Sequence, residues 1–244
     1  FFQLMDYLIS KPFFVPVWAT LLLSLLLSSC DVTRGRGDLI TETRPEKNFH
    51  ALEVHTGGRI EVRTDSVFKV EVTCEENILP YLETDVKNGV LKINFDRTVY
   101  DVDGLRIVVS APQWDGFELS GSADLEVEDP IKGKDLALRV SGSGDIDVSK
   151  AEFEKVQCSV AGSGSVTLSG KGDVLEANIS GSGDIEALQF PVKKSKVNIS
   201  GSGDARMEVT ETLEVIINGS GSLEYRGNAV VNSHINGSGR VRKI

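Results

Sequence analysis

The chain has 244 residues, of which 40% are hydrophobic and 25% charged, and its net charge is −10 at pH 7. This composition is that of a globular protein with enough apolar residues for a sizeable core. The acidic balance, without a long Lys/Arg cluster, excludes a nucleic-acid-binding protein, since phosphate-backbone binders need a basic face.

The first thirty residues have the pattern of an export signal. Lys11 precedes a mostly apolar run over 13–27, which is too short for a comfortable membrane span and leads into Leu27-Ser28-Ser29-Cys30. That ending resembles the bacterial lipobox, in which the cysteine becomes the lipidated N-terminus after cleavage. We therefore predict a lipoprotein signal peptide over 1–30 and a lipid on Cys30 that anchors the protein to a membrane. An ordinary cleaved secretory signal is the alternative.

Residues 31–46 are polar, with little apolar pattern, and are predicted to form a flexible tether. From residue 47 the apolar residues alternate with polar ones, as they do in half-buried β-strands. Asn88-Gly89 is a strong turn signal between two such strands. Because no segment has helical periodicity, we predict an all-β domain over 47–244, with an irregular β-rich part over 47–116.

The regular part, 117–244, repeats a Gly-Ser-Gly motif every 18–21 residues. The fullest copies read Ser-Gly-Ser-Gly-Asp and lie at 141–145, 180–184 and 200–204. We call the first glycine of each copy its leading glycine; these are Gly121, Gly142, Gly162, Gly181, Gly201, Gly219 and Gly237. A fixed period of this size is typical of a solenoid, in which each repeat forms one coil.

Residues at even offsets from the leading glycines are apolar. Two residues before them lie Leu119, Val140, Val160, Ile179, Ile199, Ile217 and Ile235. Even offsets share one face of a strand, so stacked coils make continuous apolar ladders. We predict a right-handed single-stranded parallel β-helix with about 20-residue repeats. Thr56 aligns with the leading glycines, so the solenoid should start near residue 49, with about three coils and insertions between Thr56 and Gly121.

Residues at odd offsets should face water. The residue after each leading glycine is serine in all seven copies, and acidic residues dominate three and five positions after it, giving way to arginine near the C-terminus. These positions form a repetitive hydroxyl and carboxylate surface, which we call the candidate face. Its predicted binding residues are Ser143, Asp145, Asp147, Ser182, Asp184, Glu186, Ser202 and Asp204.

The repeated Val-x-Ile-Ser-Gly-Ser-Gly-Asp-Ile pattern, behind a lipobox and a β-rich first half, resembles the family "Putative auto-transporter adhesin, head GIN domain". The resemblance covers roughly residues 47–244. It implies a right-handed β-helix and a location in the bacterial envelope or on the cell surface, and it brings no catalytic residues.

We therefore predict a non-enzymatic, adhesin-like outer-membrane lipoprotein that presents the candidate face to a glycan or a surface protein, without cofactor or metal. One alternative is a carbohydrate-active enzyme, because Asp145 and Asp147 lie about 7 Å apart on one strand face, as do the carboxyls of inverting glycosidases. Calcium on the aspartate column is another. A third is a structural module that forms a homo-oligomer through the solenoid ends.

Cys74 and Cys158 each share a strand face with valines. This pattern predicts two buried small hydrophobic residues. An exported location permits a disulfide, but the sequence does not show whether the two cysteines meet.

Overall fold

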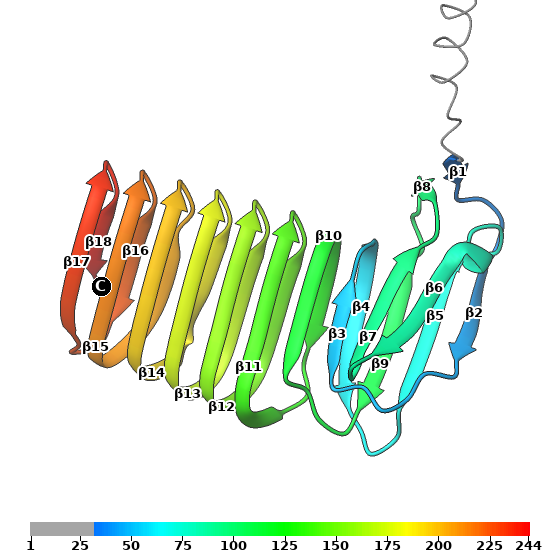
Figure 1. Cartoon of the computed structure of the whole chain (residues 1–244), viewed down its shortest axis with the longest axis horizontal. Coiled ribbons are helices and arrows are strands. Elements are labelled where there is room, and N and C mark those ends of the chain that lie inside the picture. The colour runs from blue at the N-terminus through cyan, green and yellow to red at the C-terminus, as the bar shows by residue number, and fades with distance from the viewer. Residues whose placement is uncertain (1–31) are drawn as a thin grey trace, which may run out of the picture. The chain divides into compact units, whose positions relative to one another are not determined.

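The computed structural model describes residues 32–244, so the predicted signal peptide over 1–30 and Cys30 lie outside the described residues. Thr33–Ile244 forms one compact unit, built almost entirely from strands. Its strands stack in parallel coils, as Figure 1 shows, and the predicted β-helix class is confirmed. Within the described residues, no helix is long and apolar enough to cross a membrane.

The regular coils follow one another in sequence order, each pairing in parallel with the next. Their strands are β10 (Gly116–Val127), β11 (Ile131–Gly142), β12 (Asp145–Gly162), β13 (Ser165–Gly181), β14 (Asp184–Gly201), β15 (Ala205–Gly219), β16 (Ser222–Arg226), β17 (Val230–Gly237) and β18 (Arg240–Lys243). Each leading glycine pairs with the leading glycine of the next coil, from Gly121 through to Gly237. The period read from the sequence is therefore the period of the stack.

The N-terminal coils are arranged out of sequence order. Their elements are β3 (Ala51–Val54), β4 (Gly57–Thr64), β5 (Lys69–Glu75), the 3-10 helix η1 (Leu79–Tyr81), β6 (Leu82–Lys87), β7 (Val90–Phe95), β8 (Thr98–Tyr100) and β9 (Arg106–Ala111). Strands β3 and β4 pair directly with β10, while β7 and β9 pair with the opposite edges of β3 and β4. The coil of residues 51–64 thus lies between its successor along the chain and β10 (Figure 1).

This arrangement corrects one expectation and confirms another. Thr56 does occupy the position of a leading glycine, because Gly57 pairs with Ser122. The interval between Thr56 and Gly121 is one coil in space, however, and not three. The intervening residues pass over the far side of β3 and β4 through the antiparallel strands β5 and β6 before returning to β10.

The predicted flexible tether over 31–46 is also wrong in part. β1 (Val32–Arg34) pairs with β8, and β2 (Leu39–Arg44) pairs antiparallel with β5. Strand β2 is mostly exposed, and it is held by its main chain and by the guanidinium of Arg44, which donates to the carbonyls of Leu79 and Leu82 at 3.3 Å each. Because it buries almost no side chain, this strand carries no apolar pattern.

The core consists of the predicted ladders. From Leu119 to Ile217, the column two residues before the leading glycines is no more than 2% exposed. Cys74 and Cys158 are both free thiols that are fully buried in this core, which confirms the prediction of small buried hydrophobic residues. They do not form a disulfide.

Candidate functional site: the stacked corners

The candidate face is organised by a corner that only glycine can form. Gly201 has a φ of +131°, and a Cβ atom there would lie 2.2 Å from the carbonyl oxygen of Gly181 in the preceding coil. The second glycine of the motif has no room either, since a Cβ on Gly203 would lie 2.0 Å from the carbonyl oxygen of Gly183. From the coil of Gly142 onward, where both glycines are present, the coils approach closely enough at the corner that a side chain would separate them.

Main-chain hydrogen bonds make this corner rigid. The carbonyl oxygen of Gly181 accepts the N–H groups of both Ser202 and Gly203, at 2.8 and 3.2 Å. The same forked bond forms from Gly121, Gly142, Gly201 and Gly219 to the coil that follows each. We call the seven serines that follow the leading glycines the serine strip. The N–H groups of six of them, from Ser143 to Ser238, are thus bound to the preceding coil.

Three of the four aspartates that lie three positions after a leading glycine connect successive coils. Asp145 accepts the backbone N–H and the hydroxyl of Ser165, at 2.8 and 2.7 Å. Asp184 accepts the N–H of Asp204 at 2.9 Å, and Asp204 accepts the N–H of Ser222 at 2.7 Å. Each of these carboxylates caps a corner N–H of the next coil.

The two serines of this column, Ser165 and Ser222, support the capping role. Where the preceding coil carries Ser165, which has no carboxylate, the N–H of Asp184 donates to the carbonyl oxygen of Gly164 at 3.2 Å instead. After Ser222 the N–H of Arg240 donates to the carbonyl oxygen of Gly221 at 3.3 Å. Aspartate therefore recurs in the motif because it stabilises the corner. It leaves the charge of the carboxylate exposed on the surface.

The serines have no such structural role. Ser143, Ser182 and Ser202 are exposed, and their hydroxyls make no hydrogen bond within the described part of the chain. Coils stack at about 4.8 Å, so these hydroxyls form a straight row with that spacing. They are the groups of the candidate face that are free to meet a ligand.

The carboxylates five positions after the leading glycine differ in their surroundings. Asp147 pairs in register with Glu126, and burial followed by the charges of Glu126 and Glu128 raises the pKa of Asp147. Glu186 instead lies 3.6 Å from the guanidinium of Arg206. The predicted change from acidic to basic residues toward the C-terminus is therefore present on this face.

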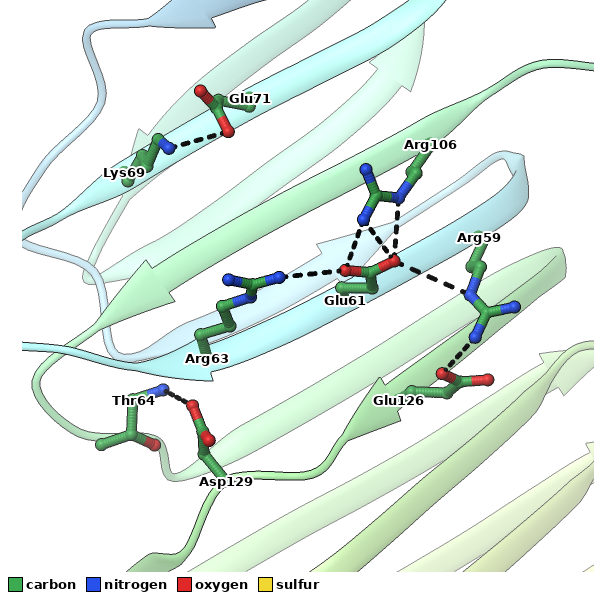
Figure 2. A network of polar contacts seen from close by, with 9 residues as sticks. All are labelled: Arg59, Glu61, Arg63, Thr64, Lys69, Glu71, Arg106, Glu126 and Asp129. Atoms are coloured by element: carbon green, nitrogen blue, oxygen red, sulfur yellow. Dashed lines mark hydrogen bonds and ion pairs between the residues drawn. The ribbon is translucent and has the colours of Figure 1, made fainter.

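Arginines also lie beside the candidate face at its N-terminal end, and the sequence analysis did not predict them. Figure 2 shows Glu61 on β4 bound by Arg106 at 2.8 and 2.7 Å and by Arg63 at 3.4 Å. Arg59 joins this group to Glu126 on β10 at 2.7 Å. The hydrogen bond from Arg106 is the main cause that lowers the pKa of Glu61. These arginines align with the candidate face only through the order β9–β4–β10, which the sequence does not reveal.

The structure brings the candidate residues together on one strip but not into a cleft. The pair Asp145 and Asp147 is separated from Asp184 and Glu186 by the coil of Ser165. None of the eight candidate residues lines the five main hollows of the described surface. Among residues 32–244, no group of three or more His, Cys, Asp or Glu side chains could hold a metal ion.

Three solved structures illustrate how widely this fold is shared. A "putative adhesin" from Bacteroides fragilis NCTC 9343 is 24% identical, with a TM-score of 0.82 over 86% of this chain and 99% of that one. A "putative adhesin" from Parabacteroides merdae ATCC 43184 is 24% identical, with a TM-score of 0.71 over 88% and 99%. A "putative lipid binding protein" from Parabacteroides distasonis ATCC 8503 is 23% identical, with a TM-score of 0.74 over 88% and 100%.

These likenesses show that the fold is shared. The search of curated proteins found no match. The family model for "Putative auto-transporter adhesin, head GIN domain" matches residues 48–229, which span most of the solenoid and all eight predicted binding residues. The chain belongs to this adhesin-head family.

Proposed function

We propose that the protein is a non-enzymatic, lipid-anchored adhesin-like scaffold of the bacterial envelope, which presents its candidate face to a repetitive ligand such as a surface glycan. Family membership supports the coarser part of this role, an adhesin-like envelope or surface protein. The lipid on Cys30 and the outer-membrane location rest on the lipobox pattern of the sequence.

The observation that carries the proposal is the row of unbonded serine hydroxyls on a rigid stack. Seven identical groups at a spacing of about 4.8 Å match a polymer with evenly repeated hydroxyls better than a single small molecule. The row is preorganised by the corner hydrogen bonds, so a ligand orders few groups when it binds. An active site would require one distinguished position with perturbed carboxyls in a cleft, whereas the strip repeats on an open surface.

A glycan array probed with the purified protein tests this proposal. A triple variant with Ser143, Ser182 and Ser202 changed to alanine should lose binding, while its fold stays intact because these hydroxyls make no internal bond. A second variant with Asp145, Asp184 and Asp204 changed to asparagine keeps an oxygen acceptor for each corner N–H and removes only the charge.

The matched control changes three serines away from the strip and from the surface hollows, namely Ser66, Ser159 and Ser233, to alanine. Binding lost in the serine-strip variant and kept in the control supports the candidate face. Equal binding by the wild type and both candidate-face variants removes that face from the proposal. A complete absence of glycan binding by the wild type favours the structural module that associates through the solenoid ends, which size-exclusion chromatography with light scattering would detect as a homo-oligomer.

The lipid anchor has its own test. Cells that express the chain with radiolabelled palmitate should label it, and Cys30→Ser should abolish the label and release the protein from the membrane fraction. An unlabelled wild-type protein would support the ordinary secretory signal instead.

A further inference from the structure

A hollow of about 810 Å³ lies at a different bend of the coil, where β10 to β13 turn toward their next strands. It is lined by the bends of successive coils and by the loop 112–114 that leads into β10. None of the residues of the candidate face takes part in it. The hollow is therefore a separate feature of the solenoid surface.

The hollow exists because this bend shortens from coil to coil. Three residues, 128–130, connect the paired strands in the first coil; two residues, 149–150, do so in the next; and Ser169 alone does so in the third. At the third coil a Cβ on Gly170 would lie 2.0 Å from the carbonyl oxygen of Ala151, so the chain is pressed against its neighbour. Loss of a residue at each step draws the surface inward and leaves a concave site.

The apolar residues beneath the hollow are already covered. Trp114 and Ile131 are each 2% exposed, and the indole N–H of Trp114 donates to the carbonyl of Arg63 at 3.0 Å. The Trp114 ring also packs against Phe117, with a centroid distance of 5.4 Å. The floor beneath the hollow is thus rigid.

The rim is basic, in a chain of net charge −10. Lys132, Lys150 and Lys171 line the hollow against one carboxylate, Glu152, which pairs with Lys171 at 3.0 Å. Lys132 and Lys150 have no carboxylate partner among the described residues. Two ammonium groups without a carboxylate partner, beside a concave site, favour an anionic ligand.

We propose that this hollow binds an acidic saccharide, whose carboxylate lies between Lys132 and Lys150 and whose hydroxyls face Ser149. The anionic part of this assignment follows from the two lysines. The saccharide part rests on the proposed function as a glycan-binding adhesin. The site would distinguish charged from neutral glycans, which the uncharged serine row does not do.

Titration calorimetry at low salt with trigalacturonate, and with the neutral galactotriose as its uncharged counterpart, tests the proposal. We expect the acidic trisaccharide alone to bind. Lys132→Gln with Lys150→Gln should weaken it at least about tenfold, the effect of losing one charge-assisted hydrogen bond. The control, Lys194→Gln with Lys196→Gln, makes the same charge change at two exposed lysines outside the hollow and should bind as the wild type does.

The other outcomes overturn the proposal. Equal loss in both double variants would show only long-range attraction to positive charge. If the neutral trisaccharide binds as tightly as the acidic one, the two lysines do not select the ligand by its charge. If inorganic phosphate competes as strongly as trigalacturonate, the hollow binds anions in general and does not recognise a saccharide. The serine-strip variant keeps both lysines, so its failure on the glycan array and the failure of this site are separate results.

Discussion

Replacement of one leading glycine tests the corner most sharply. In Gly201→Ala the new Cβ would lie 2.2 Å from the carbonyl oxygen of Gly181, and the residue would have to keep a φ of +131°. A side chain in such a conformation costs about 1–3 kcal/mol, and the contact with a backbone atom adds to it, because the coils must separate. We expect a total loss of about 3–5 kcal/mol in the free energy of unfolding.

The assay is thermal unfolding followed by circular dichroism. For a domain of this size, that loss lowers Tm by about 6–20 °C. The control is Gly116→Ala, because a Cβ at Gly116 meets no atom closer than 3.5 Å and its φ is not positive. An equal Tm for the two variants would refute the claim that stacking at the corner requires glycine.

Three further predictions concern single groups. Asp184→Ala should lose about 1 kcal/mol of stability because the N–H of Asp204 loses its acceptor, whereas Asp184→Asn should be nearly neutral in chemical denaturation. Burial raises the pKa of Cys74 to about 11 and that of Cys158 to about 12. Both thiols should therefore resist a thiol reagent at pH 8 until denaturant is added. Rapid reaction of the native protein would contradict this prediction. The pKa of Asp147 is raised in the folded state, so its ionised carboxylate lowers the stability at a pH above that pKa, and this cost is absent at a pH below the pKa of the unfolded chain. Asp147→Asn should therefore raise Tm at pH 7 but not at pH 3. A Tm shift of the same size at both pH values would contradict this account.

The solenoid was predictable because its signal is a strict repeat. A serine after every leading glycine and an apolar residue two positions before it fix the register of each coil, and the structure places these residues in the same columns. Asn178 and Asn198 also share one column, and the side-chain amide of Asn198 donates to Oδ1 of Asn178 at 2.9 Å.

The N-terminal part was less predictable because spatial order is not sequence order there. Alternation in 51–64 identified the strands, but nothing local indicates that β3 and β4 lie between β7, β9 and β10. Strand β2 was not predicted for another reason. It is held at the edge of the sheet by main-chain pairing, which requires no pattern of apolar residues in the sequence.

The sequence predicted which residues form the candidate face, but it did not predict which of them stabilise the fold and which are free to bind a ligand. Sequence columns place Asp184 and Ser182 side by side on the outside of the coil. Only the hydrogen bonds show that Asp184 caps the next coil while the hydroxyl of Ser182 stays free. A residue that recurs in every coil of a solenoid can therefore be needed to stabilise the fold and need not bind a ligand.

The most direct test of the proposed binding mode is affinity as a function of ligand length. From Ser122 to Ser238 the serine row makes six steps of about 4.8 Å, a span of about 29 Å. For an oligomer series of a glycan that binds on the array, we predict that affinity rises with each added unit until the ligand spans this row, and then levels off. A monosaccharide or disaccharide that binds as tightly as the longest oligomer would contradict the claim that the repeated corners form one extended binding surface.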